Sequence, residues 1–239
     1  MLTSVIVPMY GRADLSEQLL KTLAVDGCDY ELVVVDNGSD DDGATRRLLA
    51  GLDAQVVTVA RNVGFTRAAN IGASAASGDV LVFLNNDTEV PEGWLDPMLA
   101  GFDDHEVGIV GCKLVYPDGR LQHGGVKLVR TQGILEARHD DSAPDTRRHL
   151  TAVTGACMAV SRDCWRDVGG FFEGYFNGYE DVDLCLSAVT AGWKVLYEPA
   201  TVIVHHEGAS GPSRWFKVRE NVALLQERWL GQFEPNEEV

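Results

Sequence analysis

"GDVLVFLNNDTEVPEGW", residues 78–94, joins the most apolar run of the chain to a polar end. Its first half is typical of a buried strand, yet it continues directly into two amides and a carboxylate, Asn85, Asn86 and Asp87. A strand that ended only in a turn would more often finish with Gly or Pro. A strand that carries polar side chains at its C-terminal tip is typical of ligand-binding α/β sheets. The stretch therefore predicts a sheet with a site at its strand ends.

The segments before this stretch repeat the same pattern. Apolar runs expected to be strands alternate with helical periodicity, and the ranges are 4–12, 30–43 and 54–62 for strands and 13–25, 44–52 and 64–77 for helices. This alternation over residues 1–90 predicts βαβ units in a mostly parallel, doubly wound sheet. Right-handed crossovers place the C-terminal strand ends along one edge. Polar residues from four strand ends would meet there: 8–12, 36–42, 61–62 and 85–87.

The second half of the chain has a less regular pattern. Residues 105–130 predict strands with a hairpin around 117–119, and the polar stretch 136–149 predicts a mobile loop over the site. Residues 150–171 predict a strand and a short helix, and residues 178–210 predict a helix, a strand and a polar turn. No internal repeat and no linker rich in Pro, Gly or Ser divides the chain.

Length, charge and cysteine content restrict the class of protein. The 239 residues suit one large domain or two small ones, and the net charge of −16 disfavours nucleic-acid binding. No apolar run approaches the roughly 18 residues that span a bilayer, and the N-terminus reads as a strand rather than a signal peptide. The five scattered cysteines lack CxxC spacing and predict free, reduced thiols. We therefore expect a cytoplasmic protein without a transmembrane segment.

Two strand ends carry carboxylates with different expected roles. Asp36 is placed to accept hydrogen bonds from a base or a ribose, whereas residues 40–42 are more simply explained as a solvated turn that caps the next helix. Asp87 suits a hard cation such as Mg²⁺ or Mn²⁺, but one carboxylate needs a second ligand. His205 and His206, which follow another predicted strand, are the candidates.

Three acids begin a predicted helix after a segment rich in Gly and aromatic residues, "GGFFEGYFNGY" at 169–179. Glu180, Asp181 and Asp183 would stabilise the helix N-terminus through its dipole in any protein. The preceding segment could instead shape an acceptor pocket, and a carboxylate beside it could act as a general base. Both interpretations stay open from the residues alone.

The ordered set of motifs resembles the family 2 inverting glycosyltransferases, most closely the rhamnosyltransferase-like branch, over about residues 3–230. The motifs are "VIVPMYGR" (5–12), "VVVDNGSDD" (33–41), "RNVGFTRAAN" (61–70), "VLVFLNNDTEVPEGWL" (80–95), "TGACMAVSRDCWRDVGGF" (154–171), "GYEDVDLCLSAVTAGWKVLYEP" (178–199) and "VHHEGASG" (204–211). The resemblance implies a GT-A fold: a Rossmann-like, mostly parallel sheet flanked by helices, with a smaller acceptor-side sheet region. It implies one domain, 1–239, with a nucleotide-sugar-binding half (1–100) and an acceptor-binding, catalytic half (101–239).

The resemblance also implies the chemistry and the partners. The donor would be a UDP-, TDP- or GDP-linked sugar, the cofactor Mn²⁺ or Mg²⁺, and the reaction a single displacement with inversion. The acceptor would be a hydroxyl of a glycan or of a lipid-linked glycan, with possible peripheral association at the inner face of the membrane.

Site residues carry over from the matching motifs. Those implied for the nucleotide-sugar are Pro8, Tyr10, Asp36, Arg61, Asn62, Arg67, Asn70, Asn86 and Asp87. Asp87 would also bind the metal together with His205, and His206 is the alternative ligand. Asp181 would be the catalytic base, with Glu180 beside it orienting the acceptor.

Two departures from the family pattern keep alternatives open. "NND" at 85–87 offers one carboxylate in place of a full DXD, and Ser187 stands where this branch often has Arg. A catalytically weak nucleotide-sugar-binding module that acts with a partner enzyme is therefore the second hypothesis. A nucleotidyltransferase ranks last, because the segment after the first strand lacks a glycine-rich, basic phosphate loop.

Overall fold

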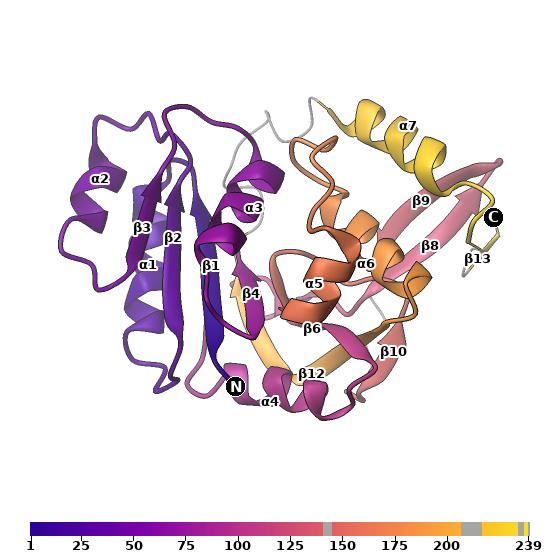
Figure 1. The fold of residues 1–239 in the computed structure, drawn as a ribbon, viewed down its shortest axis with the longest axis horizontal. Helices are drawn as coiled ribbons and strands as arrows, with labels where there is room; N and C mark the ends of the chain where they lie inside the picture. The colour runs from indigo at the N-terminus through magenta and orange to yellow at the C-terminus, as the bar shows by residue number, and fades with distance from the viewer. Residues whose placement is uncertain (141–144, 207–216, 234–236, 239) are drawn as a thin grey trace.

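A large twisted sheet forms the centre of the molecule. We describe it from a computed structural model, and the described residues are 1–140, 145–206, 217–233 and 237–238. Within these residues the sheet has the strand order β10-β12-β6-β11-β4-β1-β2-β3, with β5 paired to β12 and β7 to β6 (Figure 1). The α/β class predicted from the sequence is confirmed.

The first half of the chain follows the predicted alternation. Its strands are β1 (Thr3–Met9), β2 (Glu31–Asp36), β3 (Gln55–Thr58) and β4 (Val80–Leu84), and its helices are α1 (Ala13–Leu23), α2 (Ala44–Leu49) and α3 (Phe65–Ala75). The four strands pair in parallel, with Met9 opposite Asp36 and Ile6 opposite Phe83. Their C-terminal ends therefore share one edge of the sheet.

The second half extends the sheet with mixed pairing. Its strands are β5 (Thr88–Glu89), β6 (Val107–Val115), β7 (Leu121–His123), β10 (Arg148–Leu150), β11 (Cys157–Ser161) and β12 (Lys194–His205). Its helical elements are α4 (Leu95–Leu99), the 3₁₀ turn η1 (Ala100–Asp103), α5 (Arg162–Val168), α6 (Glu180–Thr190) and α7 (Val218–Trp229). Strand β11 inserts antiparallel between β4 and β6, so it joins the two halves into one sheet.

A smaller sheet lies at the end of the molecule far from β3, beside α7 (Figure 1). It contains β8 (Val126–Thr131), β9 (Ile134–His139) and β13 (Glu237–Glu238). The smaller second sheet that the family resemblance implied is therefore present.

Hydrophobic residues fill both faces of the main sheet. In β1 the side chains alternate, so that Val5 and Val7 face one core with Leu19 of α1, whereas Ile6 faces the other core. Helix α3 can lie close to the sheet because its buried positions are small. A Cβ at Gly72 would lie 2.5 Å from the Ile6 side chain, so this close approach requires glycine.

The predicted mobile loop at 136–149 is wrong for much of its length. Residues up to His139 belong to β9, which pairs antiparallel with β8, and residues from Arg148 belong to β10, which pairs with β12. These segments are polar because one side of each strand faces solvent, not because they lack pairing. Residues 141–144 lie outside the described residues, as does the polar turn expected after His206. The hairpin around 117–119 is confirmed by the pairing of β6 with β7.

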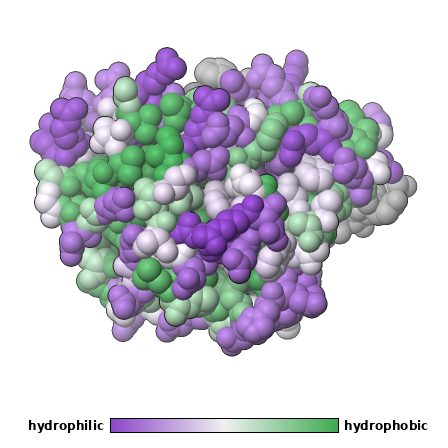
Figure 2. Space-filling view, in the orientation of Figure 1, coloured by the Kyte–Doolittle hydropathy of each residue, from purple (hydrophilic) through white to green (hydrophobic). Residues whose placement is uncertain are grey.

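The surface is largely polar on the side drawn in Figure 2. Hydrophilic residues cover much of this face, and apolar residues gather mainly toward the side of strands β1 to β3. In the edge strand β3, Val56 is 39% exposed. Among the described residues, no helix is long and apolar enough to cross a bilayer.

Candidate active site

The tip of β4 is brought against the end of β12. Strand β5 follows the tip directly and pairs antiparallel with β12, with Thr88 opposite His205. The backbone N–H of His206 also donates to the carbonyl of Asp87. As a result the Asp87 carboxylate lies 3.2 Å from His205 Nε2, and both side chains are largely buried. The structure thus brings together the two residues expected to bind a metal.

Gln122 holds the imidazole of His205 in one orientation. Its Oε1 lies 2.8 Å from His205 Nδ1, and its Nε2 donates to the backbone carbonyl of the same residue at 3.3 Å. Because the amide nitrogen of Gln122 donates to the carbonyl, its Oε1 is the atom that faces Nδ1, and it accepts a hydrogen bond from Nδ1–H. The side-chain amide of Asn85 approaches Nε2 to 3.5 Å, which also suits an unprotonated Nε2. With the proton on Nδ1, a neutral His205 ring has its lone pair on Nε2, the atom that faces Asp87.

This donor set fits a divalent cation. Nε2 of a neutral His205 ring and the Asp87 carboxylate oxygen, 3.2 Å apart, are both acceptors, and a cation bound between them would satisfy both. Imidazole nitrogen and carboxylate oxygen are ligands that Mn²⁺ accepts. Among the described residues no group of three or more His, Cys, Asp or Glu side chains could hold a metal. Phosphate oxygens of a bound nucleotide and water are suitable further ligands for such a cation.

His206, the alternative ligand, points to a different partner. Its Nε2 lies 2.5 Å from Glu89 Oε1, and Gln18 donates to the same carboxylate oxygen at 2.6 Å. The two histidines thus occupy different environments, and the geometry favours His205 as the residue that faces Asp87.

An asparagine network shapes the neighbouring strand end. Asn37 follows β2; its amide donates to Asn62 Oδ1 and to the carbonyl of Gly64, and its Oδ1 accepts from the N–H of Val63. The Asp36 carboxylate accepts from the N–H of Ser39 at 3.0 Å. The network fixes the segment after β3 against the tip of β2, so Asp36 and Asn62 share one rim.

The other residues predicted to bind the nucleotide-sugar differ in their surroundings. Pro8 is buried within β1, and Tyr10 just after it is 51% exposed. Asn86 donates to Ser16 Oγ at 2.9 Å, at the start of α1. The Asn70 amide is already engaged, because it donates to the carbonyl of Phe171 and accepts from the same residue's N–H.

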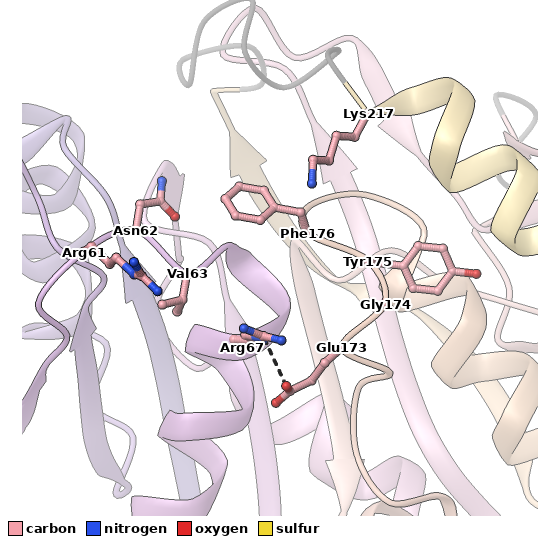
Figure 3. A pocket seen from close by; sticks show the side chains of 9 residues that line it. All are labelled: Arg61, Asn62, Val63, Arg67, Glu173, Gly174, Tyr175, Phe176 and Lys217. Atoms are coloured by element: carbon pink, nitrogen blue, oxygen red, sulfur yellow. Dashed lines mark ion pairs between the residues drawn. The ribbon is translucent and has the colours of Figure 1, made fainter.

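A pocket of about 460 Å³ opens between the start of α3 and the segment 173–176 (Figure 3). Arg61, Asn62 and Arg67 line one side of it, and Arg67 forms an ion pair of 3.0 Å with Glu173 across it. Figure 3 shows Phe176 and Lys217 on the opposite side from Arg61.

Asp181 is fixed at the start of α6 by two backbone donors. The N–H of Gly155 donates to Oδ2 and the N–H of Val182 donates to Oδ1, both at 2.8 Å. A Cβ at residue 155 would lie 3.2 Å from the Asp181 side chain, so glycine allows this close contact. A carboxylate has about four lone-pair positions, so two stay available for a substrate hydroxyl.

Two short backbone stretches connect Asp181 to His205, one of the two residues expected to bind a metal. His123, next to Gln122, accepts at Nε2 from the N–H of Thr154, and Thr154 is followed by Gly155. Burial, together with the nearby imidazoles of His139 and His205, lowers the pKa of His123 well below its usual value, so this ring is neutral. Its Nδ1–H then donates to Nδ1 of His139 at 2.8 Å.

Of the three acids at the start of α6, Asp183 is buried and bonded to neighbouring side chains. It is 1% exposed and accepts from the Trp229 indole at 2.7 Å, from the Tyr175 hydroxyl at 3.2 Å and from Arg228. Burial, reinforced by the Asp183 charge, raises the pKa of Tyr175. Glu180 is buried at the first position of the helix. Asp183 therefore ties α6 to α7 and to the aromatic segment.

Sequence reasoning missed three residues of this arrangement: Asn37, Gln122 and Gly155. Asn37 had a signal, since it follows Asp36 at a strand end. Gln122 and Gly155 had none, because their contacts to His205 and Asp181 span 83 and 26 residues.

Two solved sugar transferases of the GT-A class share this architecture. GalNAc-T7, solved with UDP, GalNAc and Mn²⁺, superposes with a TM-score of 0.73 at 19% identity over 96% of this chain and 48% of its own. The mannosyltransferase PcManGT of Pyrobaculum calidifontis, solved with GDP-Man and Mn²⁺, gives 0.65 at 21% identity over 89% and 59%. The predicted GT-A fold is thereby confirmed.

The chain belongs to glycosyl transferase family 2, whose family model matches residues 4–168. The O-antigen biosynthesis protein RfbC of Myxococcus xanthus is 32% identical over 87% of this chain and 17% of its own length. The N-acetylglucosaminyl-diphospho-decaprenol L-rhamnosyltransferase of Mycobacterium tuberculosis is 27% identical over 75% and 67%. The chain thus spans less than a quarter of RfbC. The predicted family is confirmed, with relatives in O-antigen biosynthesis and rhamnosyl transfer.

Proposed function

We propose that this chain is an inverting glycosyltransferase that moves a hexosyl or rhamnosyl group from a nucleotide-diphosphate donor to a hydroxyl of a glycan or lipid-linked acceptor. The observation that carries the proposal is the meeting of Asp87 and His205 at 3.2 Å, beside the strand ends where an open α/β sheet binds its ligand. Cell-envelope polysaccharide synthesis on the cytoplasmic side is the setting we propose, in line with the O-antigen relative.

The donor would lie over the tips of β1, β2 and β4. Asp36 would accept hydrogen bonds from the base or the ribose, with Asn37 and Asn62 fixing the wall beside it. Asp87 and His205 would hold Mn²⁺ or Mg²⁺, which supplies charge neutralisation for the departing nucleoside diphosphate. Gln122 keeps the His205 lone pair directed at this position.

Asp181 would act as the general base. The backbone donors of Gly155 and Val182 hold its carboxylate in place, and the free lone pairs would accept the proton of the acceptor hydroxyl as that oxygen attacks the anomeric carbon. A base on the face opposite the leaving group yields inversion in one displacement. Glu180, at the first position of the same helix, would orient the acceptor.

The first experiment measures the melting temperature with UDP, GDP, TDP and CMP, each with Mn²⁺ and with EDTA. We expect one nucleoside diphosphate to stabilise the chain, and only with the metal. Asp87→Ala should remove the metal-dependent part of this shift. An equal loss in EDTA would contradict the metal role, and no shift with any nucleotide would contradict the proposal.

The second experiment tests the base with Asp181→Asn. The single amide oxygen can still accept from one of the two backbone donors, Gly155 or Val182, and neither touches the donor site, so donor binding should stay within about twofold. Release of nucleoside diphosphate in the presence of acceptor should fall about 10²–10⁴-fold. Asp163→Asn, an exposed acid on α5, is the control. If donor binding is normal and Asp181→Asn is as active as the wild type, the base assignment is wrong. If the wild type binds donor without transfer, the chain is a binding module that needs a partner enzyme.

A further inference from the structure

The pocket in Figure 3 concentrates positive charge in an acidic protein. Arg61, Arg67 and Lys217 line it against one carboxylate, Glu173. The whole chain has 20 Lys and Arg against 36 Asp and Glu. Three cations from three separate segments therefore face one cavity, against the overall trend, and such a cavity attracts anions.

These cations are available to a ligand. Within the part of the chain that the structure describes, Arg61 and Lys217 form no ion pair. Arg67 does pair with Glu173, but both side chains are half exposed, at 56% and 50%. An exposed pair of this kind contributes little to stability, so a bound anion can replace it.

The pocket also offers an aromatic wall of suitable size. Phe176 is 39% exposed, and the ammonium group of Lys217 lies 5.1 Å from its ring centroid. Tyr175 turns its hydroxyl away from the arginines, toward Asp183 (Figure 3). A volume of about 460 Å³ lies within the range of small-molecule sites. An apolar ring beside cations suits a sugar ring that carries a negative charge.

The pocket lies on the acceptor side of the segment 61–64. On one side this segment contacts the tip of β2, since a Cβ at Gly38 would lie 2.4 Å from the backbone of Arg61. On the other side it contacts the aromatic segment, since a Cβ at Gly64 would lie 2.4 Å from the carbonyl of Phe176. The same aromatic segment leads within five residues to Asp181. A ligand here would lie across the segment 61–64 from Asp36, and it would share a wall with the segment that leads to Asp181.

We propose that this basic pocket binds a phosphate- or carboxylate-bearing sugar unit of the acceptor, with Arg61, Arg67 and Lys217 pairing with the anionic group and Phe176 covering the ring. This assigns the side chains of Arg61 and Arg67 to the acceptor rather than to the donor. The inference rests on the proposed function and names the acceptor class. The donor's own diphosphate is the other source of the same chemistry, so the test must separate the two.

Saturation-transfer NMR with glucose 1-phosphate as the probe makes this test. Methyl α-glucoside serves as the neutral counterpart, each with and without Mg²⁺ and a saturating amount of the nucleoside diphosphate that raises the melting temperature. We expect glucose 1-phosphate to bind more tightly than methyl α-glucoside and to stay bound when the nucleotide is present. Lys217→Gln should weaken this binding at least about fivefold, because one charged contact is lost.

Lys21→Gln is the matched control, since it removes the same charge from an exposed helix position outside the pocket. Displacement of the probe by the nucleotide would assign the pocket to the donor's diphosphate and overturn the proposal. Equal binding by Lys217→Gln and the wild type, or no preference over methyl α-glucoside, would overturn it as well. Failure of the proposed function gives a different result, because it is seen when no nucleotide raises the melting temperature. The NMR experiment tests only what the pocket binds.

Discussion

The first hundred residues and the rest of the chain present their candidate site residues in different ways. In the first part, Asp36 is the last residue of β2 and Asp87 comes three residues after β4, so the ends of these strands bring both to one edge. In the second part, His205 and Asp181 are fixed by partners 83 and 26 residues away. Local pattern thus locates the residues of the first part, whereas long-range contacts set the geometry of the second.

One buried aspartate in each part makes the same comparison for stability. Asp26, after α1, is 3% exposed and accepts from the Trp94 indole at 2.8 Å and the Tyr30 hydroxyl at 3.0 Å. Asp183 has the same kinds of partners, an indole and a phenol, but also binds the guanidinium of Arg228. The second part therefore adds a buried charge pair where the first part uses neutral donors.

Asp183→Asn tests this difference and should have the largest effect on stability. The substitution leaves the Arg228 guanidinium without its carboxylate and turns an amide toward donors, so we expect a loss of about 3–5 kcal/mol of unfolding free energy. Urea denaturation followed by tryptophan fluorescence measures it. Asp26→Asn is the matched variant and should cost about 1–2 kcal/mol, because no cation is left unpaired. Equal losses in the two variants would show that the charge pair of Asp183 with Arg228 adds no stability beyond that of neutral donors.

The sequence predicts much of the first part because its rules are local. Alternating apolar and helical segments set the strands and helices up to residue 84, and polar residues after the strands identify Asp36 and Asp87. The helix expected over 64–77 is likewise present as α3, and the small residues of its buried side include Gly72.

The second part resists prediction for a physical reason. The polar stretch 136–149 looks like a loop, but backbone pairing with β8 and β12 makes strands of its ends. Pairing partners distant in sequence are not visible in the local pattern of hydrophobic residues. The roles of Asp181 and Asp183 were equally open, since both begin the same helix and only the fold distinguishes the solvent-accessible side from the buried one.

Gln122→Leu tests whether a long-range contact sets the metal site. Loss of the Oε1 acceptor frees the His205 ring to rotate or change tautomer, so we expect metal-dependent nucleotide affinity to fall about 10–100-fold. Affinity in EDTA should not change. Isothermal titration with the nucleoside diphosphate, with and without Mn²⁺, measures both values.

Gln122→Glu is the control, because its carboxylate still accepts from His205 Nδ1 while it loses the bond that Gln122 Nε2 donates to the His205 carbonyl. It should keep the metal-dependent affinity within a few-fold of the wild type, and the proton on Nδ1 should be seen in both proteins by ¹⁵N NMR of the imidazole. If Gln122→Leu binds the metal and nucleotide as the wild type does, His205 is oriented without Gln122, and the contrast between the two parts weakens.

The smallest expected effect concerns acid stability, which sharpens the same contrast because all six histidines lie beyond residue 100. Burial lowers the pKa of His123 well below the usual 6.5, so below pH 6.5 the unfolded chain takes up a proton that the native chain refuses. Stability then falls with falling pH, by at most about 1.4 kcal/mol per pH unit for this group. In His123→Gln, whose amide cannot titrate, the unfolding free energy should fall less between pH 6.5 and 5.5 than in the wild type, by up to about 1.4 kcal/mol.

His105→Gln, at an exposed position, is the control, and its unfolding free energy should fall as much as that of the wild type over the same pH range. An unchanged pH dependence in His123→Gln would show that the ring is protonated in the native state, and the neutral link between Thr154 and His139 would then be wrong.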